Sequence, residues 1–186
     1  IKNTLRFGTG LIGNHFTVDG RLSNITSEGY VDRASSDLKS FYLSTAWLNA
    51  NNSLRLNIFS GKEKTYQSWN GIPEAMLETD RTYNSAGTEK PGTPYENETD
   101  NYTQTHYQLF YNHQFNSFWK ANVAVFLTQG SGYYEQYKAG ETLADYGVPD
   151  YNSGSGVITT TDLVRQLWLK NNFYGTIFSD QKKKNK

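Results

Sequence analysis

Cysteine is absent from the 186 residues, which excludes disulfide bonds, thiolate metal ligands and cysteine nucleophiles. Net charge is absent as well: Lys plus Arg and Asp plus Glu number 18 each, so no overall field would attract nucleic acid or an anionic membrane. Long apolar runs are also missing, and none approaches the roughly 18 residues of a transmembrane helix. A strand of a transmembrane barrel needs only about 9–11 alternating residues, so a membrane location is not excluded.

Aliphatic side chains are scarce, whereas aromatic ones are plentiful. Hydrophobic residues make up 36% of the chain and aromatic residues 15%, with 14 Tyr, 10 Phe and 4 Trp. A chain rich in tyrosine and poor in aliphatic residues is unusual for a soluble core. The basic end "DQKKKNK" is interpreted as a solvated turn or frayed tail, and no nucleic-acid partner is expected.

Apolar and polar residues alternate with a period of two along most of the chain, which is typical of β-strands. About seven strands are expected, the clearest of them at residues 15–23, 38–49, 54–58, 106–112, 120–128 and 163–178. The letters "SGK" after Ile58 are interpreted as a break. In the last strand Asn171 falls in phase with Leu167 and Phe173, which indicates a bulge or a wrong phase. The best helical signal is a short turn in "GIPEAMLETD", opened by Pro73.

The connections alternate between short and long. Tight polar turns are predicted at 50–52 ("ANN") and 115–118 ("FNSF"), and long loops at about 65–100 and 130–161. Loops longer than about 12–15 residues are uncommon in compact domains unless they are functional. Long loops confined to one end of the sheet are typical of transmembrane barrels, which have short periplasmic turns and long extracellular loops.

Two architectures fit this alternation: a transmembrane barrel and a soluble β-sandwich. The polar face would meet water inside a wide barrel or outside a sandwich. Aromatic residues beside the short turns favour the barrel, because they fit an interfacial girdle. These residues are Trp47, Phe115, Phe118 and Trp119.

No catalytic motif is found, and neither an enzyme activity nor a cofactor is expected. His15, His106 and His113 are placed in strands, where the odd spacing of the last two turns them to opposite faces, so no metal site is predicted. "GTGLIG" precedes no helical pattern, and its glycines are interpreted as allowing strand curvature or close packing. Carboxylate pairs that could hydrolyse glycosides are instead interpreted as solvated loop residues: Asp32 with Asp37, and Glu96 with Glu98.

Aromatic residues in the long loops are the candidate ligand-binding residues. Large rings with polar tips on an outward surface can grip flat organic ligands or sugars. The competing interpretation is that the loops pack against one another. The candidates are Tyr66, Trp69, Tyr83, Tyr133, Tyr134 and Tyr137.

The stretch "DGRLSNITSEGYVDRASSDLKSFYLS" (19–44), with "SLRLNIFSGKEKTYQSWNGIPEAML" (53–77), resembles the barrel portion of TonB-dependent outer-membrane receptors. In that family a strand ending in a "GR-S-I-S-GY-DR" pattern leads through an outer loop into a strand beginning near "SDL-S". "ETDNYTQTHYQLFYNHQF" and "GSGYYEQYK" are similar to the strands and long loop that follow. The matching positions are Gly20, Arg21, Ser23, Ile25, Ser27, Gly29, Tyr30, Asp32, Arg33, Ser36, Asp37, Leu38 and Ser40.

This resemblance implies a barrel of about 22 strands whose lumen holds a plug domain. Residues 1–186 are then expected to be a partial barrel domain of a larger receptor in the cell outer membrane, with 29–37 as an outer loop. The implied partners are outer-membrane lipid, the plug domain, the TonB complex and a small-molecule or glycan ligand. The implied function is import of a scarce nutrient: siderophore-bound iron, haem, cobalamin or a glycan. The expected lumen-facing residues are Asp19, Arg21, Ser23, Arg55, His106 and Gln108.

Two other functions remain open at this point. One is a secreted β-sandwich that binds carbohydrate through Trp69 and the tyrosine-rich loops. The other is a glycoside hydrolase, which would need a carboxylate pair such as Glu96 and Glu98.

Overall fold

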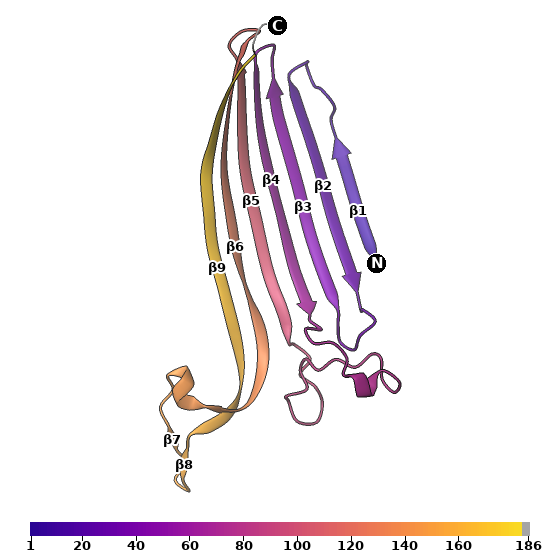
Figure 1. Cartoon of the computed structure of the whole chain (residues 1–186), viewed down its shortest axis with the longest axis vertical. Coiled ribbons are helices and arrows are strands. Elements are labelled where there is room, and N and C mark those ends of the chain that lie inside the picture. Colours follow the sequence, from indigo (N-terminus) through magenta and orange to yellow (C-terminus); the bar gives the residue numbers. More distant parts are fainter. Residues whose placement is uncertain (184–186) are drawn as a thin grey trace.

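The protein forms one long, curved antiparallel sheet in a computed structural model that describes residues 1–183 (Figure 1). The sheet order is β1-β2-β3-β4-β5-β6-β9, so each strand pairs with the next one that joins the sheet. Such an up-and-down order confirms the predicted antiparallel meander, although no closed barrel is formed. The strands are β1 (Lys2–Gly8), β2 (Phe16–Ser27), β3 (Ser36–Leu48), β4 (Asn52–Tyr66), β5 (Thr99–Gln114), β6 (Trp119–Thr142) and β9 (Thr160–Lys182).

Long and short connections lie at opposite ends of the sheet, as predicted (Figure 1). The short ones span 9–15, 49–51 and 115–118, and the longer ones span 28–35, 67–98 and 143–159. Asparagine closes two of the short turns. The Oδ1 of Asn49 accepts hydrogen bonds from the backbone N–H groups of Asn51 and Asn52, and Asn116 does the same for Phe118 and Trp119.

The two longest connections contain little regular structure. The predicted short turn is present as the 3₁₀ helix η1 (Glu74–Met76), which Pro73 precedes. The connection between β6 and β9 holds a second 3₁₀ helix, η2 (Leu143–Tyr146), and a small hairpin of β7 (Tyr151–Asn152) and β8 (Val157–Ile158). Within residues 1–183 no helix is long and apolar enough to cross a membrane.

Several predicted boundaries are wrong because glycine lies inside strands where the sequence predicts a break or a loop. The strand predicted to break at "SGK" continues through Gly61 to Tyr66, paired with β5. The loop predicted at 130–161 is instead strand β6 up to Thr142, followed by a shorter connection. In "GTGLIG" the error is the reverse, because strand is predicted where the structure has a turn. Gly10 and Gly13 have φ values of +66° and +55° and shape a turn rather than a curved strand, and His15 also lies in this turn.

Gly130 and Gly132 lie within β6 because the side chain of Tyr102 crosses over them. A Cβ atom at Gly130 would lie 1.9 Å from the Tyr102 hydroxyl, and one at Gly132 would lie 2.1 Å from the backbone oxygen of Asn101. The Tyr102 hydroxyl reaches past β6 and donates a hydrogen bond to Asn171 on β9 (3.2 Å). Glycine in a strand often marks such a close approach.

The last strand is regular at Asn171. Its pairing with β6 is unbroken from Leu163 to Lys182, so Asn171 points to the same face as Leu169 and Phe173 without a bulge there. The register shift occurs instead between Lys138 and Glu141 on β6. Of the basic tail, Asp180 to Lys182 extend β9, and residues 184–186 lie outside the described part of the chain.

The cross-strand register separates two faces of the sheet. On the first, which we call the apolar face, directly opposed residues form apolar rows such as Trp47, Leu54, Tyr111 and Val123, or Leu43, Ile58, Tyr107 and Leu127. Phe41 and Val125 on this face are 40% and 39% exposed. No second sheet covers the apolar face within residues 1–183, which argues against the β-sandwich alternative.

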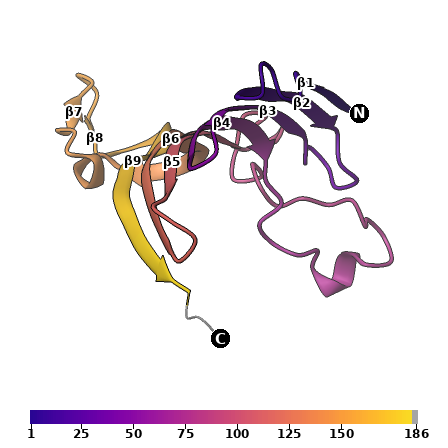
Figure 2. The same ribbon diagram turned by 90° about the horizontal axis from the view of Figure 1, so that it is seen from above.

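The other side, which we call the polar face, carries Arg21, Tyr42, Asn57, Gln108 and Thr128. Its side chains are more crowded: Ser44 is 1% exposed and Thr128 9%. Figure 2 shows that the sheet is bent into an arch. Because side chains converge on the inside of a curved sheet and spread on the outside, we infer that the polar face is the concave one.

Candidate functional site

The six residues predicted to face a lumen all lie on the polar face. Asp19, Arg21 and Ser23 alternate along β2, Arg55 lies on β4, and His106 and Gln108 lie on β5. Arg55 Nη1 donates a hydrogen bond to Ser44 Oγ (2.9 Å), and the His106 ring stacks on Phe59 with centroids 4.4 Å apart. His106 Nδ1 also lies 2.9 Å from the Thr128 hydroxyl. The arrangement is a wall of mostly polar side chains held by cross-strand contacts.

A hollow of about 660 Å³ lies at the β1–β3 side of this polar face. It is lined by Arg6, Asp19, Arg21 and Tyr42, among others. Arg6 and Arg21 are directly opposed in the ladder, although like charges in that position repel. Neither guanidinium forms an ion pair with a carboxylate within residues 1–183. The hollow could therefore receive an anionic group.

The six candidate aromatic residues do not form one cluster. Trp69 is 61% exposed and meets the Tyr134 ring edge-on, with centroids 5.7 Å apart. Tyr133 points to the opposite face of β6 and packs on Trp168 of β9, at 4.8 Å. Tyr137 donates a hydrogen bond to Asp162, and Tyr83 is half-buried in the 67–98 loop. Three of the six, Tyr133, Tyr134 and Tyr137, thus belong to strand β6 and not to a loop.

Tyr66 has a structural position instead of an open one. It is only 4% exposed, and its hydroxyl donates a hydrogen bond to the Tyr95 backbone oxygen (2.6 Å) while it accepts one from Arg33 Nε (3.2 Å). Arg33 also donates to the backbone oxygens of Asn84 and Ala86, at 2.6 and 3.0 Å. Together these contacts join the 28–35 loop to the 67–98 loop.

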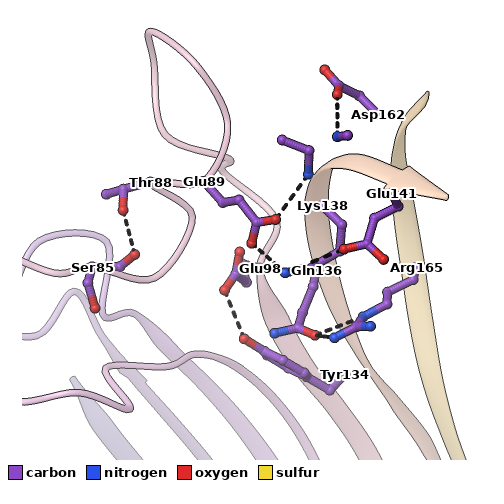
Figure 3. A network of polar contacts seen from close by, with 12 residues as sticks. Ser85, Thr88, Glu89, Glu98, Tyr134, Gln136, Lys138, Glu141, Asp162 and Arg165 are labelled. Carbon is purple, nitrogen blue, oxygen red and sulfur yellow. Dashed lines mark hydrogen bonds and ion pairs between the residues drawn. The ribbon is translucent and has the colours of Figure 1, made fainter. Parts of the chain in front are cut away.

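A bulge in β6 holds the second anchor of the 67–98 loop (Figure 3). The register shift leaves the amides of Ala139 and Gly140 outside the strand ladder, and two carboxylates accept their hydrogen bonds. Glu89 Oε1 accepts a hydrogen bond from the Ala139 backbone N–H (3.0 Å), and Asp162 Oδ1 accepts one from the Gly140 backbone N–H (2.9 Å). Glu89 also forms an ion pair with Lys138 Nζ (2.7 Å). These bonds and the ion pair hold the loop tip against β6.

Hydrogen bonds and burial shift the pKa values of one carboxylate and two tyrosines in this region. Partial burial would raise the pKa of Glu89, but the bonds from Lys138 and Ala139 lower it below its ordinary value of 4.5. Burial and a hydrogen bond to Glu135 raise the pKa of Tyr95 to about 12. Burial and a bond to Glu98 raise that of Tyr134 to about 12. Both tyrosines therefore remain hydrogen-bond donors at neutral pH.

We expect Glu89→Ala to release the loop tip. The variant loses one ion pair and one charge-assisted hydrogen bond at a half-exposed position, which should lower the free energy of opening the loop by on the order of 1 kcal/mol. This corresponds to about fivefold faster amide hydrogen exchange of the 85–95 backbone. Because the pKa of Glu89 is depressed in the folded state, its contribution is complete above pH 4.5 and is lost as the pH falls through the depressed pKa. The exposed neighbour Glu96→Ala serves as the control. Equal exchange in the two variants would contradict the anchor.

The carboxylate pairs do not converge on a shared cavity. Glu98 is 7% exposed and accepts a hydrogen bond from Tyr134 (3.0 Å), whereas Glu96 is exposed. Asp37 is paired with Lys39, and Asp32 is exposed in the 28–35 loop. Within residues 1–183 no group of His, Asp and Glu side chains is placed to hold a metal ion.

Several residues of this region were not selected from the sequence. Arg33 stands out in the sequence only as part of the family pattern, and Arg6, Asn84, Glu89 and Lys138 have no local sequence signal. Each acts through a partner distant in the chain, such as Lys138 for Glu89. A signal could have come only from knowing which strands pair.

The sequence matches no family model and no curated protein. Among solved structures, the chain is similar to the ferric-catecholate import receptor Fiu from E. coli K12, in a crystal structure of its open form. The TM-score is 0.68 at 13% sequence identity, and the match covers 100% of this chain but 29% of that receptor. At this identity the likeness concerns the fold: the chain is an all-β antiparallel sheet similar to part of a barrel protein.

Proposed function

We propose that the chain is part of the barrel wall of a TonB-dependent receptor in the cell outer membrane, which binds and imports a scarce nutrient. The observation that carries the proposal is the sidedness of the single sheet. Within residues 1–183, one face presents exposed apolar rows without a covering layer, and the other presents charged and amide side chains on β2 to β5 together with apolar ones such as Phe126, Leu169 and Phe173. In hydrocarbon, apolar side chains need no cover, whereas a soluble sheet would have to bury them.

Three further observations support this proposal. All longer loops lie at one end of the sheet, as in outer-membrane barrels. The 19–44 stretch carries the family pattern. The whole chain matches a segment of a receptor whose described cargo is a ferric catecholate. The nutrient itself is proposed only as a class: siderophore-bound iron, haem, cobalamin or a glycan.

The polar face then forms part of the lumen wall. Arg6 and Arg21 line a hollow together with Asp19 but form no ion pair within residues 1–183, so this wall would contact an acidic part of the plug domain or an anionic nutrient. Trp69 and Tyr134 at the loop end are the strongest candidates for first contact with an aromatic ligand, because their rings already meet and Trp69 is exposed.

The proposal is tested by growth of a strain from which the gene has been deleted. We expect slower growth when one nutrient of the proposed class, offered in its complexed form, is limiting, and restoration by the wild-type gene. The protein should be recovered in the outer-membrane fraction. A protein recovered only in the soluble fraction, or unchanged growth on every candidate nutrient, would contradict the proposal.

A further inference from the structure

On the side of the long loops, the apolar face is bordered by a row that contains lysines, one uncharged row beyond the row of Leu43. Between the row that contains Trp47 and the row that contains Leu43, this face carries no charged side chain. The first charged row beyond it holds Lys39 on β3 and Lys62 on β4, which are directly opposed. The same row continues through Thr103 and Ser131 to Lys170 on β9.

Contacts within the protein do not account for this row. Directly opposed like charges destabilise a strand pair. Lys39 Nζ lies 3.1 Å from Asp37 Oδ2, but both side chains are exposed, at 63% and 46%. Lys62 and Lys170 form no ion pair within residues 1–183. Lys39 thus has one exposed carboxylate partner and Lys62 and Lys170 have none within residues 1–183, and an external anion would relieve the repulsion between Lys39 and Lys62.

The opposite end of the apolar face differs. Its flanking row consists of Asn52, His113, Ala121 and Asp180, without lysine or arginine. In the next row Lys182 lies over the Trp119 ring, 5.1 Å from its centroid. The lysine row therefore belongs to the long-loop end, and is not a general feature of both borders.

Resting on the proposed membrane location, we propose that Lys39, Lys62 and Lys170 bind the phosphate groups of lipid headgroups in the leaflet beside the long loops. A lysine just beyond the hydrocarbon keeps its stem along the apolar surface and its ammonium group at headgroup level. Near a membrane surface each such cation attracts anionic lipid. Asn24, Thr103 and Ser131 in the same row supply further hydrogen-bonding groups.

The test titrates the protein, purified from its own membrane in mild detergent and stripped of lipid, with three probes. These are diphosphoryl lipid A, its dephosphorylated form and inorganic phosphate, and the readout is the rise in Tm. We expect saturable stabilisation by the diphosphoryl lipid alone. In K39Q/K62Q/K170Q the half-saturating concentration should rise about fivefold for each lysine removed. Saturation by inorganic phosphate at similar concentrations would overturn the lipid assignment.

A matched control removes three charges elsewhere. K2Q/K90Q/K120Q changes lysines that lie on the polar face or in the 67–98 loop, and it should titrate like the wild type. Should the triple variant fail to fold, Lys62→Gln alone is measured, with an expected fivefold rise. Unchanged lipid binding in a folded variant would refute the proposal that the lysine row binds lipid phosphate, and would leave the proposed function untouched. A wild-type protein found outside the membrane fraction would refute both this proposal and the proposed function.

Discussion

Leu109→Arg is expected to destabilise the membrane-inserted protein by about 2–4 kcal/mol, the cost of arginine on the lipid-facing side near the bilayer centre. Leu109 lies in the middle of the apolar face, opposed by Leu56 and Val125 and flanked along β5 by Tyr107 and Tyr111. Leu109 is 38% exposed, and within residues 1–183 no second layer covers it. The measurement is the fraction of folded protein in the membrane at increasing urea concentrations. Folded and unfolded protein are distinguished by their different electrophoretic mobility in gels of unheated samples.

Its neighbour Gln108 supplies the control. Gln108 points to the polar face, where Asn57 and Phe126 oppose it. Gln108→Arg introduces the same side chain one residue away and should change the free energy of unfolding by less than about 0.5 kcal/mol. If both arginines cost the same, the two faces do not meet different solvents, and the proposed membrane location is wrong.

Gly132→Ala is expected to cost about 1–3 kcal/mol, because its Cβ atom would overlap the backbone of β5. The nearest atom is the Asn101 backbone oxygen at 2.1 Å, followed by the Tyr102 Cα at 2.6 Å. Neither atom can move without disturbing the strand pair. Urea unfolding of the membrane-inserted protein measures the loss.

Two comparisons separate this overlap from a general effect of alanine. Gly61 on β4 has open space around its Cβ position, so Gly61→Ala should be neutral within about 0.5 kcal/mol. At Gly130 the nearest atoms are side-chain atoms, the Tyr102 hydroxyl and Asn171 Oδ1. Adding Tyr102→Ala should therefore relieve Gly130→Ala substantially but Gly132→Ala only slightly. Equal rescue at the two glycines would be inconsistent with this packing.

Alternation alone predicts the two faces of β2 to β6, but not of β9, where Leu169 and Phe173 lie on the polar face. The apolar positions Leu54, Leu56 and Ile58, with the polar Arg55 and Asn57 between them, lie on opposite faces as the period of two requires. The end of the sheet that carries the long loops is also predictable from the sequence. Short asparagine-containing turns alternate along the chain with long segments rich in proline and glycine, so in an antiparallel meander each kind lies at one end. These features depend on residues near one another in the chain.

The errors occur where a residue's role depends on a distant partner. Gly130 and Gly132 resemble a loop until Tyr102, on the neighbouring strand, is placed over them. The sequence predicts Tyr66 as a ligand contact, but the structure encloses it between Arg33 and the 67–98 loop. The bulge amides reach Glu89, 50 residues away. No local pattern contains these pairings.

The Tyr102 side chain lies across three strands, and this bears on how the sheet is assembled. A slip of two residues between β5 and β6 keeps every side chain on its proper face, so the apolar pattern does not distinguish it from the native alignment. It would, however, bring Tyr134 or Gly130 opposite Tyr102 instead of Gly132. Glycine under the Tyr102 ring thus favours the native register over the slip that would place the bulky Tyr134 there.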